Sequence, residues 1–166
     1  MDFKPVDYGS FHEHIFTLID KGWMLITAGQ LNDYNMMTAS WGGLGTLWNR
    51  PVAFCFVRPT RHTFSFMERE TLFSLSFFPE SFRKALSYCG SHSGRDVNKA
   101  RETGLTPFEI CGTVSFTQAR LILVCKKIYA DFLRPENFID PTIEENYPKK
   151  DYHRQYVGEV VGLFEK

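Results

Sequence analysis

The alternation of apolar and polar positions predicts β-strands along most of the chain. In TLFSLSFF, residues 71–78, alternating positions place phenylalanine and leucine on one face and serine on the other. PVAFCFV, residues 51–57, is continuously apolar, which is typical of a strand that is covered on both faces. Further strands are predicted at 23–29, 34–41, 113–124, 126–133 and 155–164.

Short helices interrupt this pattern, and they are predicted at 12–20, 61–69, 81–89 and 96–103. Thr60 can cap the second helix, while Asp96 and Gly104 stand at the start and the end of the last one. Many closely spaced strands with a few short helices indicate a β-barrel or sandwich of the α+β type. The regular strand–helix alternation of a doubly wound sheet is missing from the sequence.

A glycine cluster follows the strand predicted at 34–41, within the stretch NMMTASWGGLG. A Walker phosphate loop needs a lysine after its last glycine, and none follows Gly45. A dinucleotide-binding fingerprint needs a third glycine, and Trp48 stands in its place. The simplest prediction for the cluster is therefore a loop between two strands, in which the glycines turn the chain.

The segment 134–151, RPENFIDPTIEENYPKKD, contains three prolines and is mostly polar. We therefore expect a long surface loop. A loop of this length can act as a lid or a partner contact, or it can be a solvated connection, and the sequence leaves both open.

Length, composition and charge narrow the class of protein. A chain of 166 residues predicts a single domain, residues 1–166, and its sixteen phenylalanines predict a well-stabilised core. The formal net charge is zero, which argues against nucleic acid as a partner because phosphate backbones bind basic faces. No apolar run approaches the roughly 20 residues of a membrane span, and no secretory signal is expected.

The four cysteines are widely spaced, and neither they nor the histidines show the spacing of a metal site. Cys55 and Cys125 lie in apolar runs, so we expect both to be buried free thiols. A chain of this size without a disulfide pattern fits a reducing compartment, which predicts a cytoplasmic protein.

Acidic residues are absent between Asp33 and Glu68, and again from 81 to 95. These regions bring cations and hydroxyl groups to two predicted helix starts: Arg58, Arg61 and Thr63 at one, and Ser93, Arg95 and Lys99 at the other. Guanidinium groups, hydroxyls and unpaired N–H groups at a helix start can bind a phosphate. The alternative is that these cations point to water, or that Arg95 pairs with Asp96.

The strand predicted at 34–41 carries a second candidate feature. Polar side chains alternate with larger or apolar ones, in the order Asn35, Met37, Thr38, Ala39, Ser40 and Trp41. A strand edge of this kind offers backbone and side-chain hydrogen bonds to a flat heterocycle. Together with a phosphate site, it describes a pocket for a mononucleotide-like cofactor, and a flavin fits.

At this point the sequence resembles the flavin reductase-like proteins with an FMN-binding split barrel, a family that includes flavoredoxin. The resemblance rests on NMMTASWGGLG (35–45), WNRPV (48–52), VRPTRHTF (57–64), SHSGRDVNK (91–99) and YHRQYVGEV (152–160). The first and third stretches are the most specific. Asn98 and His62 depart from the pattern, in which Asp and Tyr are common, and we expect Asn98 on the exposed side of a short helix.

The resemblance implies a mainly β, α+β fold, a six-stranded antiparallel Greek-key split β-barrel with a few short helices. It also implies a homodimer with one FMN per subunit near the dimer interface. The residues implied to line the flavin ring and ribityl chain are Asn35, Met37, Thr38, Ala39, Ser40 and Trp41. Those implied to approach the phosphate are Arg58, Arg61, Thr63, Ser93, Arg95 and Lys99.

If FMN is bound, the redox chemistry belongs to the cofactor, so no catalytic side chain is predicted. Three functions remain open. The first is an NAD(P)H-dependent flavin or ferric reductase. The second is a flavoredoxin-like electron carrier that keeps FMN bound and passes electrons to a protein partner without its own NAD(P)H turnover; the electron donor, NAD(P)H or a redox protein, stays open. The third is a non-redox barrel that binds a nucleotide as a sensor or scaffold.

Overall fold

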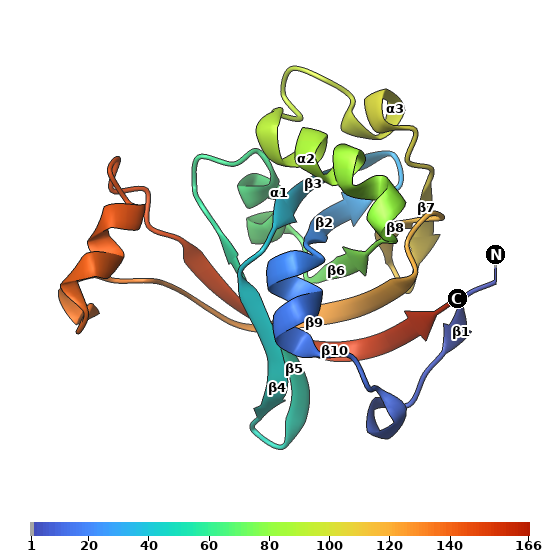
Figure 1. The fold of residues 1–166 in the computed structure, drawn as a ribbon, viewed down its shortest axis with the longest axis horizontal. Helices are drawn as coiled ribbons and strands as arrows, with labels where there is room; N and C mark the ends of the chain where they lie inside the picture. Colours follow the sequence, from blue (N-terminus) through green and yellow to red (C-terminus); the bar gives the residue numbers. More distant parts are fainter. Residues whose placement is uncertain (1) are drawn as a thin grey trace.

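The computed structural model describes residues 2–166 and consists mainly of one curved antiparallel sheet of eight strands (Figure 1). The strands follow the order β3-β2-β6-β9-β10-β5-β4, and β1 pairs with the end of β10. Their bounds are β1 Lys4–Pro5, β2 Met24–Gln30, β3 Asp33–Ala39, β4 Gly42–Leu47, β5 Arg50–Val57, β6 Leu72–Phe77, β9 Leu121–Phe132 and β10 Arg154–Glu165. A separate hairpin joins β7 Pro107–Ile110 to β8 Thr113–Phe116.

Alternating side chains of the sheet enter two hydrophobic cores, one on each face. On β9, Leu123 and Cys125 join the core inside the barrel, whereas Ile122 and Val124 join the core beneath α2 and β8. β6 shows the predicted alternation, but its serine face is also buried beneath β8. Ser74 Oγ donates to Val114 O of that strand at 2.6 Å. The β7–β8 hairpin thus covers a polar strand face by satisfying its hydroxyls.

The long strands β9 and β10 bend together and curl the sheet. Their pairing shifts register between Val157 and Gly158 and again between Val160 and Gly162. Such bulges increase the local twist and bend the strands that carry them. A side chain at Gly158 would lie 2.7 Å from the ring of Phe73, so glycine is needed where the curled strand crosses the core. The predicted α+β split-barrel fold, built on an antiparallel sheet, is confirmed.

The glycine cluster is the clearest error of the sequence analysis, because Gly42–Leu47 is the edge strand β4 and not a loop. The chain turns instead at Trp48 and Asn49, whose φ angles are 51° and 56°. Two successive left-handed residues make the tight turn that suits a β-hairpin, although glycine and asparagine are the usual residues there. The turn therefore lies after the glycines.

Two other strand predictions were wrong in part, one in its bounds and one in its burial. The strands predicted at 113–124 and 126–133 are instead β8 and the continuous β9, separated by a turn in which Ala119 N donates to Phe116 O. The strand predicted at 51–57 is present as β5, but only one of its faces is fully buried: Ala53, Cys55 and Val57 are enclosed, while Phe54 and Phe56 are half-buried. The sequence analysis also missed β1 and β7.

The helices are short: α1 is Thr63–Arg69, α2 is Arg83–Ser91, α3 is Lys99–Thr103, and Thr17–Lys21 is a π-helical turn. The predicted caps Thr60 and Asp96 were wrong, because His62 and Asn98 occupy the N-cap positions of α1 and α3. Asn98 is exposed as expected, but its Oδ1 accepts from Arg101 N at 3.1 Å. Gly104 ends α3, as predicted, and the structure shows it in a left-handed conformation.

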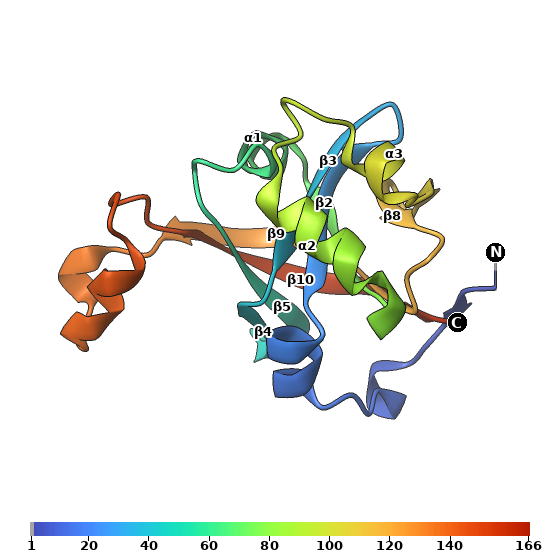
Figure 2. The ribbon, with the colours of Figure 1, turned by 45° about the horizontal axis from the view of Figure 1, so that its top comes forward.

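Residues 134–151, here called the arm, extend away from the barrel between β9 and β10 (Figures 1 and 2). The arm is largely exposed, as predicted, but it contains the 3-10 turns Pro135–Asn137 and Pro141–Asn146. Tyr147 is only 3% exposed, and its ring lies 5.9 Å from that of Phe138 and 5.0 Å from that of Tyr152. This aromatic cluster gives the arm a small core of its own.

Cys55 and Cys125 are buried free thiols, as predicted. Within residues 2–166, no helix has the length and hydropathy required to cross a bilayer.

Candidate functional site

Two adjoining cavities lie where β3 and β5 end and where the 58–63 and 91–99 segments meet. The strand-end cavity, of about 170 Å³, is lined by Met37, Thr38, Ala39, Ser40, Trp41, Phe56, Arg58, Arg61 and His153. The loop cavity, of about 120 Å³, is lined by Met37, Thr60, Arg61, His62, Thr63, Cys89, Ser91, His92, Ser93, Gly94 and Lys99. Met37 and Arg61 contribute to both, so the two spaces adjoin at these residues.

The structure therefore brings together most of the residues proposed from sequence. The strand residues from Met37 to Trp41 line the strand-end cavity, and Thr63, Ser93 and Lys99 line the loop cavity. The two cation-bearing segments, which are far apart in the sequence, face one shared space. The helices behind them have only seven and five residues, so the helix dipoles invoked for this site from the sequence are weak, and side chains define it.

The floor of the loop cavity is a buried polar cluster. Asn35 is 5% exposed and donates from Nδ2 to Thr63 Oγ1 at 2.7 Å, which joins β3 to α1. Gly94 covers this pair so closely that a Cβ there would lie 2.0 Å from Asn35 Oδ1. Asn35 therefore supports the cavity from below and does not line it.

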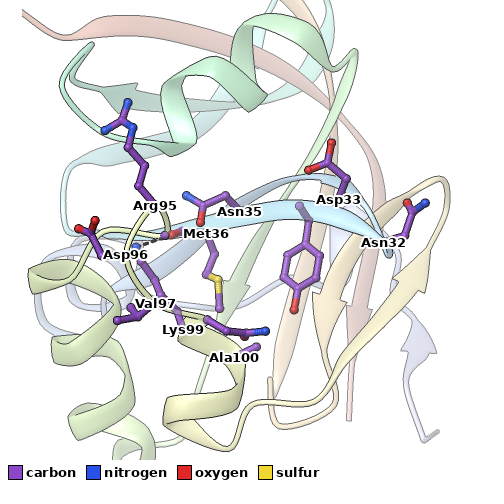
Figure 3. Close-up of a pocket in the computed structure, with 12 residues that line it drawn as sticks. Asn32, Asp33, Asn35, Met36, Arg95, Asp96, Val97, Lys99 and Ala100 are labelled. Carbon is purple, nitrogen blue, oxygen red and sulfur yellow. Dashed lines mark hydrogen bonds between the residues drawn. The ribbon is translucent and has the colours of Figure 1, made fainter.

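Lys99 is buried at the wall of the same cavity. Its Nζ donates to Met36 O at 2.8 Å (Figure 3) and to Cys89 O, also at 2.8 Å, and thereby joins β3, α2 and α3. Burial lowers the pKa of Lys99 to about 8, and the positive charge of Arg61 also lowers it. An ammonium has three N–H groups, so one donor remains for a ligand in the cavity.

The two arginines of the 58–61 turn differ in their partners. Arg58 Nη1 forms an ion pair with Asp151 at 2.6 Å, its Nη2 donates to Asn146 O at 2.8 Å, and its guanidinium packs on the Tyr147 ring. Arg61 is exposed and donates to Gly90 O at 3.1 Å. Across residues 2–166, no carboxylate lies within ion-pair distance of Arg61, so its charge is free to meet an anion.

His153 is a site residue that the sequence analysis did not assign. It is 7% exposed, its Nδ1 lies 2.9 Å from Tyr147 Oη, and its ring lies 5.1 Å from that of Trp41. Burial, aided by the charge of Arg58, lowers the pKa of His153 to about 4, so the ring is neutral at pH 7. The motif YHRQYVGEV contained this residue, but sequence alone gave no sign that the arm would enclose it.

Arg95 lies apart from the loop cavity. Its side chain is exposed and lines a polar groove of about 440 Å³ between the β2–β3 turn and the 94–100 segment. In Figure 3 it points away from Lys99 and the floor of that groove. No ion pair joins Arg95 to Asp96 among residues 2–166, so the pairing considered from the sequence does not occur, and Arg95 is exposed to solvent instead.

The comparisons with known proteins show the family and the fold of this chain. The model of the flavin reductase like domain matches residues 16–165, so the chain belongs to the flavin reductase-like domain family. The resemblance inferred from the sequence is thereby confirmed. A search of proteins with curated functions found no significant match.

Solved structures show the same fold at low sequence identity. The FMN-binding domain of a flavin reductases-like enzyme from Shewanella baltica OS155 superposes with a TM-score of 0.71 at 20% identity, over 99% of this chain and 77% of that one. Flavoredoxin from Methanosarcina acetivorans gives 0.68 at 20% identity, over 87% and 68%. An NADH:FAD oxidoreductase from Streptomyces globisporus C-1027, in complex with NAD and FAD fragments, gives 0.65 at 16% identity, over 87% and 74%.

Proposed function

We propose that the protein binds FMN in the two adjoining cavities and acts as a flavin-dependent oxidoreductase of the flavin reductase type. One observation carries the proposal. A cavity bounded by a strand end and aromatic rings adjoins, at Arg61, a cavity that holds hydroxyls and cations. This arrangement matches a molecule with a flat ring at one end and a phosphate at the other, and the family to which the chain belongs supports it.

The loop cavity fits the phosphate. Arg61 offers a guanidinium without a carboxylate partner, and the hydroxyls of Thr63 and Ser93 line the same space. Lys99 adds a charge that is already desolvated, so the cost of burying it is met in the folded protein. We assign the phosphate contacts to these four residues, with Asn35 as their support.

The strand-end cavity fits the ring. Thr38 and Ser40 follow the free edge of β3, and Trp41 offers a partly exposed aromatic face. His153, neutral at pH 7, lines the same cavity beside Trp41, with 5.1 Å between the two ring centroids. When bound, FMN supplies the redox chemistry, because its ring accepts and returns electrons.

We also propose that a second copy of the chain completes the site. The strand-end cavity is smaller than the about 300 Å³ at the lower end of small-molecule pockets, so one chain encloses a ring only in part. Large apolar side chains remain exposed on the nearby sheet: Trp48 is 57% exposed and lies 6.2 Å, centroid to centroid, from Tyr129, which is 46% exposed. Exposed aromatic pairs of this kind are typical of protein interfaces.

The assignment of the phosphate end is tested by comparing FMN with riboflavin, which lacks the phosphate. We expect Arg61→Ala to weaken FMN binding about 10- to 150-fold, the range for losing a hydrogen bond to a charged group, and to change riboflavin binding little. Fluorescence titration measures both affinities. Arg101→Ala, which removes a guanidinium that is exposed on α3, is the control. Equal losses for FMN and riboflavin would show that Arg61 does not contact the phosphate.

The same purified protein distinguishes the candidate functions. Rapid oxidation of NADH or NADPH in the presence of FMN supports the reductase. A tightly held flavin with negligible turnover supports the electron carrier instead. A protein that gains no thermal stability from added FMN contradicts both and leaves the non-redox barrel.

A further inference from the structure

Lys99 is the buried charge of the loop cavity, and none of its contacts supplies a full negative charge. It is 5% exposed, and its Nζ donates only to the backbone carbonyls Met36 O and Cys89 O; Figure 3 shows the first of these bonds. In the described part of the chain, no carboxylate lies within ion-pair distance of its ammonium. The ammonium is therefore hydrogen-bonded but not neutralised, which is a costly state for a buried charge.

The groups around Lys99 add positive charge to the loop cavity. Besides Lys99, the titratable side chains that line it are Arg61, His62, Cys89 and His92. The acids of the neighbouring elements are engaged or placed elsewhere. Asp33, at the start of β3, pairs with Arg69 at 2.9 Å, and Asp96 lines the polar groove together with Arg95. On α3 itself, Glu102 pairs with Arg101 at 3.3 Å.

A phosphate in the loop cavity would be the missing negative charge beside Lys99. Burial lowers the pKa of Lys99 to about 8; Cys89 opposes this shift, and Arg61 adds to it. An anion at this distance favours the charged form of the amine and so raises its pKa. When the pKa of a group rises on binding, the protein takes up a proton as the ligand binds.

We propose that the protein takes up a proton at Lys99 when it binds FMN, so that the site retains FMN at neutral pH and releases it as the pH rises. The inference rests on the proposed function, because it needs the phosphate of FMN in the loop cavity. It deepens that function, since protonation of one buried lysine then sets how strongly the site prefers FMN to riboflavin.

The effect has its own pH window, from 7 to 9. The second ionisation of a phosphate ester lies near pH 6, and histidine titrates near 6.5. Burial, followed by the charges of Arg95 and Lys99, lowers the pKa of His62 from 6.5, so this ring is neutral in the window. Burial also raises the pKa of Cys89 above 9.0, which keeps its thiol protonated. We expect FMN affinity to fall about tenfold between pH 7 and pH 9, and riboflavin affinity to change little.

Calorimetry counts the protons directly. FMN is titrated into the wild-type protein in Tris and in HEPES, whose heats of ionisation differ, and the difference between the two binding enthalpies gives the number of protons taken up. With a pKa of about 8 for Lys99, we expect uptake of about half a proton per FMN at pH 8 and more at pH 9. Riboflavin should bind without uptake, because it lacks the phosphate.

Variants assign the proton to Lys99. Lys99→Met removes the charge at similar length, so FMN binding should be at least about tenfold weaker at pH 7, independent of pH up to 9, and without proton uptake. Lys99→Arg supplies a charge that does not titrate in this range, and it should also bind FMN without uptake. Lys84→Met is the matched control, because Lys84 is exposed on α2 and does not line the cavity. It should take up as many protons as the wild type.

The outcomes that overturn the inference differ from those that overturn the proposed function. FMN binding without proton uptake at pH 8 and 9 overturns the inference and leaves the proposed function standing. Equal uptake with riboflavin, or uptake that persists in Lys99→Met, overturns it as well, because the proton then belongs to another group. These wild-type measurements decide the question without the variants. A protein that binds no FMN at any of these pH values refutes the proposed function and the inference together.

Discussion

The loop cavity and the strand-end cavity meet at Arg61 but are built in different ways. The loop cavity has a floor of buried polar groups that are bonded to one another, with Asn35 on Thr63 and Lys99 on two backbone carbonyls. The strand-end cavity is bordered by partly exposed rings, and His153 on its wall is held in place by Tyr147 of the arm.

This difference shows which parts of a flavin site the barrel alone can fix. Bonded buried groups hold the loop cavity in one geometry, because breaking any of them leaves a buried polar atom without a partner. The strand-end cavity depends on the arm and on the proposed second subunit. We therefore expect mutations in the buried floor of the loop cavity to act mainly on folding. Mutations that affect the strand-end cavity or the proposed interface should act on pH dependence and assembly.

The largest effect is expected at Gly94. A methyl group there would lie 2.0 Å from Asn35 Oδ1, so Gly94→Ala must displace the amide from Thr63 or move the 91–98 segment. We expect a loss of about 2–3 kcal/mol in the free energy of unfolding, the upper range for overpacking, measured by urea denaturation. Gly45→Ala is the control, since a Cβ there has no atom within 4 Å. Equal stability of the two variants would mean that the floor is not rigid.

The second effect concerns His153 and acid. Its pKa is about 4 in the folded protein against 6.5 in the unfolded chain, so between these values the unfolded chain binds the extra proton. The free energy of unfolding should therefore fall as the pH drops from 6.5 to 4, by an amount on the order of 2 kcal/mol from this residue. Denaturation at several pH values should show a shallower fall in His153→Phe. Parallel pH profiles would contradict the assignment.

The smallest effect on folding, with a clear effect on assembly, is expected at Tyr129. Its ring is half exposed, and among the described side chains its hydroxyl contacts only Asp131, at 3.4 Å. Tyr129→Lys should therefore change the free energy of unfolding of the subunit by less than about 0.5 kcal/mol. If a second copy covers this face, the variant should be monomeric while the wild type is dimeric. Light scattering measures both masses, and an unaltered dimer would place the interface elsewhere.

The sequence predicted best those elements that depend on a local property, such as the alternation of buried side chains or the backbone conformation of one residue. β6 was found because its alternation reflects two faces with different cores, and the end of α3 was found because Gly104 adopts a conformation that other residues avoid. β4 was missed because three of its six residues are glycines, which predict a turn. Pairing with β5 makes this segment a strand, and the local sequence does not predict that pairing.

The candidate site was predicted in the same uneven way. Residue type selected Arg61, Thr63 and Ser93 as candidates for a phosphate site, and the structure places all three at the loop cavity. The sequence did not reveal that Asp151 pairs with Arg58, nor that Arg95 lies outside the loop cavity. These outcomes depend on how the arm and the 94–98 segment fold against the barrel. Both segments contact residues that are distant from them in the sequence.

By itself, the sequence determined that this protein is a mainly β barrel of the flavin reductase-like family, because strand periodicity and the family's motifs are local properties. Only the tertiary structure decided which cations remain free: Arg61 and Lys149 have no carboxylate partner among residues 2–166, whereas Arg58 has one. The physical reason is that an ion pair forms between groups that are close in space. The folding of the arm onto the barrel sets those distances, and the order of residues along the chain does not.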